Sequence, residues 1–315
     1  MTGPLQSDGS EPNFFIIGAA RSGTTALVEM LRQHPDVFIT DPKEPNFLAL
    51  ANTEMDFRGP GDDVLVQRYS VTDHTQYLHL YREAGARAAR GDASTSSLYY
   101  SDATIESLIR YFPDARLVVI FREPVGRAFS AFSYLRMRGF EPHADFLSAF
   151  TDEKEGLRAN WHHLWHYVEM GRYAKQLGPF IERLGPDRIR ILFYDDLCRD
   201  PIEVGRSTFA FIGVDPDVKV TSDRVNVSGK PRSVALQNAI AWMESVHSVR
   251  SAARVIVPYR LSERVKRLNL HQEGIPREVV ETLQPIYRPE MNALADLLIS
   301  AYPDIETSMP AWLRN

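Results

Sequence analysis

The sequence has little cysteine and no long apolar segment. Cys198 is the single cysteine among 315 residues, which excludes an internal disulfide and a thiolate metal cluster. This cysteine usage is typical of a reducing compartment, so we expect a cytoplasmic protein. Apolar runs such as residues 117–121 are far shorter than the roughly 20 residues that cross a bilayer. We therefore expect no insertion into a membrane.

The sequence also lacks an excess of positive charge. Lys and Arg number 36 against 41 Asp and Glu, which leaves a formal net charge of −5. Proteins that bind nucleic acid or anionic membranes usually carry a basic excess, so we expect no nucleic-acid partner. A polyanionic polymer is disfavoured as a substrate for the same reason. Nothing in the sequence indicates the oligomeric state.

The order of apolar segments indicates an α/β fold. Residues 1–13 are polar and lack the basic start and apolar run of a signal peptide, so we expect a disordered lead before a single domain at 14–315. Runs rich in β-branched and aromatic residues predict strands at 14–17, 116–121 and 189–193. Helical spacing is found at 24–34, 105–111, 126–137, 173–184, 204–212 and from 276 onward. The sequence therefore predicts a P-loop-like central parallel sheet flanked by helices.

A candidate phosphate loop joins the first predicted strand to the first predicted helix. It reads Gly-Ala-Ala-Arg-Ser-Gly-Thr-Thr over residues 18–25, where backbone N–H groups and the helix dipole can bind an anion. A Walker loop carries lysine where this sequence has Thr24, so the cation used by NTPases is missing. Arg21 can instead donate to two oxygens of a phosphate or sulfate. The candidate binding residues are Arg21, Ser22, Gly23, Thr24 and Thr25; a tight turn with a capping threonine is the alternative.

A second strand-to-helix junction carries another possible anion site. The strand at 116–121 is followed by Arg122, then by Pro124, and Ser130 comes eight residues after the arginine. Proline favours the first turn of a helix, so Arg122 and Ser130 could meet one anion. The alternative is a surface arginine and an unrelated serine on a helix.

These two junctions resemble the nucleotide-binding motifs of sulfotransferases that use 3'-phosphoadenosine 5'-phosphosulfate (PAPS), in a bacterial type related to heparan sulfate and tyrosylprotein sulfotransferases. Residues 21–25 look like the 5'-phosphosulfate loop, and Arg122 with Ser130 looks like the 3'-phosphate motif. The resemblance implies a sulfotransferase fold, PAPS as cosubstrate, no metal, and sulfuryl transfer to a hydroxyl or amine. It also implies that Arg21 neutralises charge on the bridging and leaving oxygens.

Two further segments extend the resemblance. Residues 91–100 look like a family segment that contains Glu-Lys-Thr-Pro, but Ala93 stands at the position of its lysine. A second active-site cation must therefore come from elsewhere or be absent. Residues 226–232 resemble the loop that folds over the nucleotide, which makes Lys230 and Arg232 candidates for phosphate contacts. An exposed basic loop is the alternative.

The resemblance also aligns residues 41–48 with the segment that holds the catalytic glutamate, so Glu44 is the candidate general base. A carboxylate within hydrogen-bond reach can take the proton that the acceptor loses as it attacks sulfur. The alternative is a solvated carboxylate paired with Lys43. Asp41 and Asp92 are weaker competitors.

Three histidines lie close together in residues 161–167, which we predict to be helical. His162 and His166 are four residues apart, a spacing that could bind a metal, but no third ligand is identifiable. The alternatives are a surface that faces the acceptor and an amphipathic packing element.

Two other functional classes compete with a sulfotransferase. A P-loop kinase or NTPase needs a lysine where Thr24 stands and an acidic residue where Arg122 ends the strand. A catalytically inactive nucleotide-binding scaffold would lack active-site groups. Ala93, at the position of the family lysine, is the one sign of such a loss. Among acceptors, we expect a small or medium-sized molecule such as a carbohydrate, glycolipid or secondary metabolite in a bacterium. The residues that select the acceptor would lie in the loops at 52–73 and 139–167.

Overall fold

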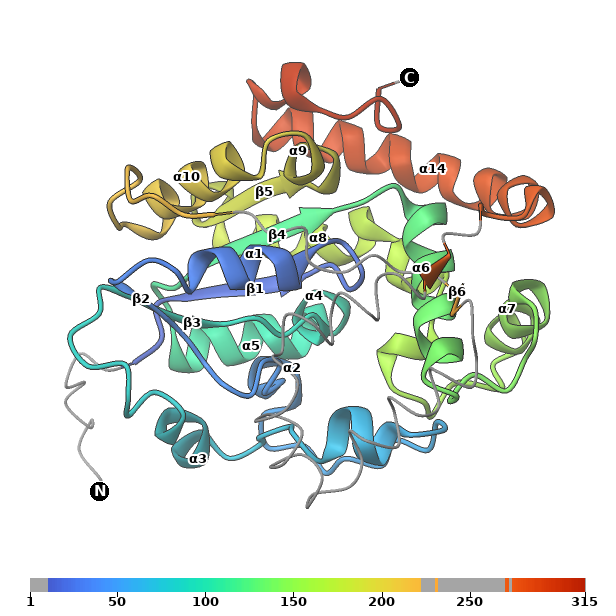
Figure 1. Ribbon diagram of the computed structural model, residues 1–315, viewed down its shortest axis with the longest axis horizontal. Helices are drawn as coiled ribbons and strands as arrows, with labels where there is room; N and C mark the ends of the chain where they lie inside the picture. The colour runs from blue at the N-terminus through green and yellow to red at the C-terminus, as the bar shows by residue number, and fades with distance from the viewer. Residues whose placement is uncertain (1–10, 222–229, 232–269, 272–273, 315) are drawn as a thin grey trace.

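The centre of the molecule is a five-stranded sheet with the order β2-β3-β1-β4-β5, in which all paired strands are parallel (Figure 1). The computed structural model describes residues 11–221, 230–231, 270–271 and 274–314. The strands of the sheet are β1 (Phe14–Gly18), β2 (Val37–Ile39), β3 (Ala89–Asp92), β4 (Arg116–Phe121) and β5 (Ile189–Phe193). A short antiparallel pair is formed by β6 (Lys230–Pro231) and β7 (Leu270–His271).

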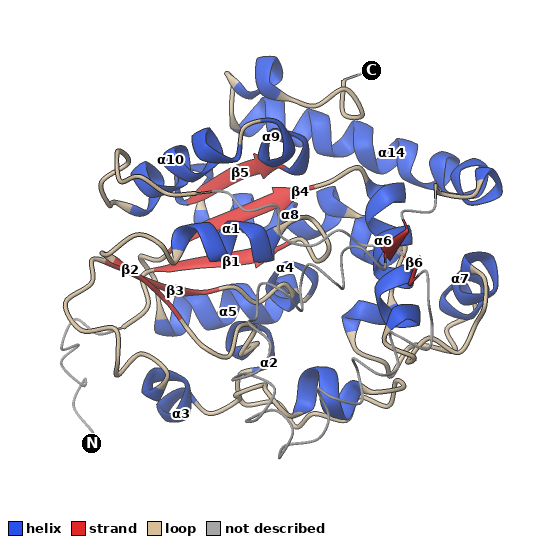
Figure 2. Cartoon of the chain, viewed as in Figure 1, coloured by secondary structure: helices blue, strands red, loops and turns tan. Residues whose placement is uncertain are grey.

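Helices cover both faces of the sheet, as Figure 2 shows. They are α1 (Thr24–Leu31), α2 (Phe47–Leu50), α3 (His74–His79), α4 (Ser96–Tyr99), α5 (Ser101–Tyr111), α6 (Pro124–Met137), α7 (Phe146–Lys154), α8 (Tyr173–Leu184), α9 (Tyr194–Arg199), α10 (Pro201–Ile212) and α14 (Arg277–Ala301). Shorter turns are η1 (Asp63–Gln67), η2 (His163–Trp165), η3 (Glu169–Gly171), η4 (Pro186–Arg188) and η5 (Ile305–Ser308). The predicted α/β class, with a parallel sheet flanked by helices, is confirmed.

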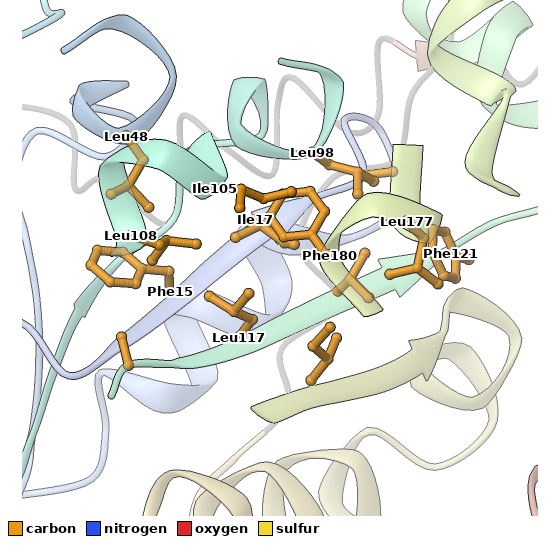
Figure 3. Close-up of a cluster of buried hydrophobic side chains, with 14 of the residues drawn as sticks. Phe15, Ile17, Leu48, Leu98, Ile105, Leu108, Leu117, Phe121, Leu177 and Phe180 are labelled. Atoms are coloured by element: carbon orange, nitrogen blue, oxygen red, sulfur yellow. The ribbon is translucent and has the colours of Figure 1, made fainter. Parts of the chain in front are cut away.

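The central strands bury both of their faces, because successive side chains of a strand point to opposite sides. Phe15 and Ile17 pack with α5, α8 and α14 on one side, whereas Phe14 and Ile16 pack with α1 and α10 on the other. Figure 3 shows the first of these layers, including Phe15, Ile17, Ile105, Leu108, Leu117, Leu177 and Phe180. This two-sided burial explains why β1 and β4 read as continuous apolar runs.

The three predicted strands and the predicted C-terminal helix are found in the structure. The strands at 14–17, 116–121 and 189–193 correspond to β1, β4 and β5, and the predicted C-terminal helix is α14. Both β2 and β3 were missed. The region 52–73 contains η1, and 139–167 contains α7 and η2, so neither is a plain loop.

The start of the described chain is held to the sheet. Asn13 N–H donates to the Arg90 carbonyl (2.7 Å), and the Arg116 N–H donates to the Asn13 carbonyl (2.9 Å). Asn13 therefore continues the pairing of β1 rather than belonging to a free lead, and residues 1–10 lie outside the described residues. A helix with the length and apolar character needed to span a membrane is not found in the part of the chain that the structure describes.

The sheet order brings the two candidate anion motifs together. β1 lies between β3 and β4, so the segments that follow these three parallel strands leave the same edge of the sheet. In open α/β sheets, ligands bind beyond the carboxyl ends of the strands, where the strand order reverses. The candidate site is therefore at this edge.

Candidate functional site

The loop after β1 ends at an α-helix with an open N-terminus. Gly23 precedes α1 with φ 95°, and no side chain caps the first N–H groups of this helix. A Cβ at Gly23 would lie 2.8 Å from Leu197 Cδ2, so glycine is required both by the backbone conformation and by space. Thr24 and Thr25 form the first turn. Their uncapped N–H groups, at the positive end of the helix dipole, suit an anion.

Arg21 connects this loop to α6. Its Nε donates to Ser130 Oγ at 3.5 Å, and its guanidinium lies 4.4 Å from the centre of the Tyr134 ring. Burial lowers the pKa of Arg21, while the charges of Tyr134 and Glu44 raise it. The guanidinium remains charged near neutral pH because arginine does not lose its proton in proteins. A fixed cation therefore lies over the loop that can bind an anion.

Arg122 lies beside the same loop. Its Nη1 donates to the Arg21 carbonyl at 3.1 Å, and its guanidinium lies 4.7 Å from the centre of the Tyr194 ring. Tyr173 holds the backbone at this point by donating its hydroxyl to the Arg122 carbonyl (2.9 Å). The structure therefore brings together Arg21 of the first motif with Arg122 and Ser130 of the second.

The N-terminus of α6 is closed, in contrast to that of α1. The Glu123 carboxylate accepts hydrogen bonds from the N–H groups of Val125 (2.9 Å) and Gly126 (2.6 Å). A carboxylate already satisfies this end of the helix and its dipole. An anion at this junction would therefore be bound by side chains such as Arg122 and Ser130 rather than by the first turn of α6.

Glu44 lies in the loop before α2 and contacts the segment between β3 and α4. Thr95 donates its hydroxyl to Glu44 Oε2 at 3.3 Å, and Lys43 Nζ lies 2.6 Å from Glu44 Oε1. The Glu44 side chain is 33% exposed, so an acceptor can reach it. Its negative charge raises the pKa of Arg21, so the two groups lie within range of each other's charge.

Asn46, which the sequence analysis did not select, fixes the backbone of Glu44. Its Nδ2 donates to the Glu44 carbonyl (2.9 Å) and to Ser70 Oγ (3.0 Å). Ser96 donates to Asn46 Oδ1 at 2.6 Å, and the Asn46 N–H donates to Ser94 Oγ at 3.0 Å. Asn46 has φ 54°, a conformation that asparagine tolerates better than most residues. In the sequence, the asparagine itself was the only signal of this conformation.

The competing carboxylates are less suited to act as a base. Asp92 is buried and accepts a 2.5 Å hydrogen bond from the Tyr77 hydroxyl, which also bonds Tyr81 (2.8 Å). Burial raises the pKa of Asp92 to about 6, and the group is committed to these tyrosines. Asp41 is exposed and lines a surface depression with His79 and Arg82. Glu44 is therefore the best placed of the three.

Ala93, which occupies the position of the family lysine, has no exposed surface. It packs in the apolar layer that contains Phe14 and Ile16. A cation near Glu44 is nevertheless present, since Lys43 Nζ contacts its carboxylate. Lys43 is thus the described amine that could serve in place of the missing lysine.

The prediction of one helix over residues 161–167 is wrong. The structure has a 3₁₀ turn at His163–Trp165, so His162 and His166 do not share a helix face. His162 and His163 are buried with ring nitrogens 2.9 Å apart, and burial lowers the pKa of His162 to about 3 and that of His163 far below its usual value. No cluster of three or more metal-binding side chains occurs in the described ranges. These two histidines are packing residues.

Asp62 explains the non-helical shape of this segment. The carboxylate is buried and accepts from the Gly59 N–H (2.8 Å), the His162 N–H (3.0 Å) and Trp165 Nε1 (2.8 Å). It therefore joins two loops that are distant in the sequence.

We expect Asp62→Ala to lower the free energy of unfolding by about 3 kcal/mol, because buried N–H donors lose their acceptor. Asp63→Ala is the matched control, since Asp63 is exposed, and it should change stability by less than about 0.5 kcal/mol. Urea unfolding of both variants measures the difference. Equal stabilities would contradict this role of Asp62.

The last predicted phosphate contacts are only partly described. The backbone of Lys230 pairs with His271 in the β6–β7 ribbon, and β6 lies against α6, the helix of Ser130 (Figure 1). Arg232 lies outside the described residues. The role of both side chains stays a prediction.

Comparison with known proteins gives a consistent result. A family model described as "Sulfotransferase family" matches residues 12–217. The chain is similar to heparan sulfate glucosamine 3-O-sulfotransferase 3B1 of Mus musculus, with 26% identity over 207 residues, 64% of this chain and 46% of the relative. It is also similar to heparan sulfate glucosamine 3-O-sulfotransferase 3A1 of Homo sapiens, with 26% identity over 292 residues, which cover 90% of this chain and 61% of the relative. The chain spans about half the length of the first of these curated relatives.

A solved structure resembles most of the chain. The crystal structure of a sulfotransferase from Alicyclobacillus acidocaldarius superposes with a TM-score of 0.72 at 27% sequence identity. The match covers 91% of this chain and 96% of that one.

Proposed function

Because this chain belongs to the sulfotransferase family, we propose that it transfers a sulfuryl group from PAPS to a hydroxyl or amine group of an acceptor. The observation that carries the proposal is the convergence of the motifs: Arg21 on the loop after β1 contacts both Ser130 and the arginine at the end of β4. Glu44 lies within the electrostatic reach of the same Arg21.

The residues suit both ends of PAPS. The uncapped first turn of α1, with Thr24 and Thr25, would hold the 5'-phosphosulfate together with Arg21. Arg122 and Ser130 would bind the 3'-phosphate, which distinguishes PAPS from ATP. PAPS supplies the activated sulfuryl group when bound, and no metal is proposed.

In the proposed mechanism, the oxygen or nitrogen of the acceptor forms a bond to sulfur, and Glu44 accepts the proton that this atom loses. The bond between sulfur and the bridging oxygen breaks, and Arg21 stabilises the negative charge that develops on the departing phosphate. Lys43 Nζ lies 2.6 Å from Glu44 Oε1 and forms an ion pair with it. The products are the sulfated acceptor and 3'-phosphoadenosine 5'-phosphate (PAP).

The same proposal includes a small or medium-sized acceptor, such as a carbohydrate, glycolipid or secondary metabolite, and a cytoplasmic location in a bacterium. The single cysteine and the likeness to the Alicyclobacillus acidocaldarius protein support the location.

The test is transfer of ³⁵S from labelled PAPS to a pool of hydroxyl and amine acceptors, compared with adenosine 5'-phosphosulfate, which lacks the 3'-phosphate. We expect transfer from PAPS and little from the second donor. Equal use of the two donors would contradict the assignment of Arg122 and Ser130. Absence of transfer together with Mg²⁺-dependent release of the γ-phosphate of ATP would favour a kinase or NTPase, and PAP binding without transfer would favour an inactive scaffold.

A further inference from the structure

A tyrosine and a histidine form an isolated hydrogen-bonded pair that the proposed mechanism does not use. The Tyr99 hydroxyl lies 2.6 Å from His166 Nδ1, and His166 Nε2 lies 2.9 Å from the Arg158 carbonyl. Both side chains are half-buried, in contrast to His162 and His163 beside them. The pair is therefore the accessible part of the histidine cluster.

Tyr99 of this pair lies one helical turn from Thr95, the residue that contacts the proposed base. Thr95, which donates to Glu44, precedes α4, and Tyr99 is the last residue of this helix. Residues four apart on a helix lie on the same face, about 5–6 Å apart between Cβ atoms. Tyr99 and Tyr134 also pack against the apolar cluster that contains Ala20 of the phosphate loop. Tyr99 is thus linked to Glu44 through Thr95, four residues earlier, and to the loop that carries Arg21 through a shared apolar cluster.

The hydrogen bonds determine what this pair can bind. A carbonyl oxygen only accepts, so His166 Nε2 carries the proton that it donates to Arg158, and Nδ1 accepts from the Tyr99 hydroxyl. The Tyr99 oxygen then offers lone pairs alone. Hydroxyl and amine groups can donate to it, whereas carboxylate and sulfate cannot.

The pair itself offers no positive charge to an anion. Burial lowers the pKa of His166, so its imidazole is neutral at pH 7. The charge of Glu169, which forms ion pairs with Arg172 and Lys175, acts on Tyr99. The guanidinium of Arg158, the residue whose carbonyl accepts from His166, is buried and bound to both carboxylate oxygens of Glu141 (2.9 and 3.0 Å).

We propose that Tyr99, oriented by His166, binds a second hydroxyl group of an uncharged acceptor whose first hydroxyl is sulfated beside Glu44. The inference rests on the proposed sulfotransferase function and names its substrate class: a neutral ring with at least two hydroxyl groups. It separates this chain from a sulfotransferase built for an anionic polysaccharide, which would need cations beside this pair.

The first experiment uses two acceptor pools with ³⁵S-labelled PAPS. One contains uncharged compounds with two ring hydroxyls, such as methyl glycosides and catechols, and the other contains the matched glucuronides and sulfated glycosides. We expect label in the neutral pool. Label mainly in the anionic pool, or in neither pool by a protein that binds PAP in calorimetry, would overturn the proposal while the nucleotide assignment stands. Failure to bind PAP would instead remove the proposed function.

The second experiment assigns the effect to Tyr99. With the best neutral acceptor, Tyr99→Phe should raise KM about 3- to 10-fold with little change in kcat, the range expected for loss of one hydrogen bond. Wild type should discriminate against an analogue without the second hydroxyl by a similar factor, and Tyr99→Phe should not. Equal discrimination by both proteins would overturn the proposal.

Three further variants separate binding from structure. Tyr100→Phe is the matched control, because burial raises the pKa of Tyr100 much as it does that of Tyr99, while the Tyr100 hydroxyl bonds the His163 backbone. Its KM should stay within about twofold of wild type. His166→Asn keeps an acceptor near the position of Nδ1 and should lie closer to wild type than His166→Leu. If His166→Leu leaves the KM unchanged, His166 does not orient Tyr99.

Discussion

Replacing Glu44 by glutamine is expected to lower kcat for sulfuryl transfer by about 10²- to 10⁴-fold, the range that general base catalysis contributes. Glutamine has nearly the same shape and can still accept a hydrogen bond from Thr95, but it cannot take the proton of the acceptor. PAP affinity should change little, because the proposed nucleotide contacts lie on the loop after β1 and on α6. Steady-state kinetics and calorimetry on one preparation measure both quantities.

Glu54→Gln is the control for this prediction, since Glu54 is an exposed carboxylate in the following loop. It should retain wild-type kcat. A Glu44→Gln enzyme with less than about threefold loss of kcat would exclude Glu44 as the base, since loss of a base costs far more. Asp41 would then be the next candidate to test.

Replacing Arg21 by alanine is expected to reduce kcat about 10²- to 10³-fold, the effect of removing one preorganised donor to a developing negative charge. PAP binding should weaken as well, because the guanidinium contributes to the anion site in the ground state. Arg21→Lys keeps the positive charge but cannot donate two parallel hydrogen bonds, so its kcat should lie between those of Arg21→Ala and wild type. Kinetics of the three proteins test this order.

Two controls accompany the Arg21 variants. Arg190→Ala removes an exposed arginine of β5 and should leave kcat unchanged. Thermal unfolding must show that Arg21→Ala is folded, because Arg21 also contacts the Tyr134 ring and Ser130. A folded Arg21→Ala with wild-type kcat would remove the charge-stabilising role from the mechanism.

The sequence predicts three strands that have a clear local pattern and misses β3, which depends on pairing. β1, β4 and β5 are rich in β-branched and aromatic residues. β3 reads Ala-Arg-Gly-Asp and has no such signal. It is a strand because β1 and β2 bind it on both sides, and Gly91 is required there, since a Cβ would lie 2.3 Å from the Phe14 carbonyl oxygen.

The candidate site divides in the same way. Arg21, Arg122 and Ser130 follow from strand-to-helix junctions that can be read locally, and the structure brings them into contact. Tyr194 lies over Arg122 although it belongs to α9, and no local pattern indicates this contact. The histidine segment was predicted as a helix because its spacing suits one.

Asp62 accounts for that error. Its buried carboxylate takes hydrogen bonds from the backbone of His162 and the side chain of Trp165, and these bonds fix an irregular turn. The partner lies about a hundred positions earlier in the chain, as the separations of 100 and 103 residues show. The local spacing of residues cannot predict a contact between positions so far apart in the sequence.

The central claim is that the site recognises a nucleotide with a 3'-phosphate, and the most direct measurement is calorimetric titration with PAP and, in parallel, with ADP. We expect wild type to bind PAP at least about tenfold more tightly, since hydrogen bonds to a charged group contribute about 1.5–3 kcal/mol. Arg122→Ala should lose this preference, and Arg190→Ala should keep it. If wild type binds PAP and ADP equally, or binds neither, the account of this site is contradicted.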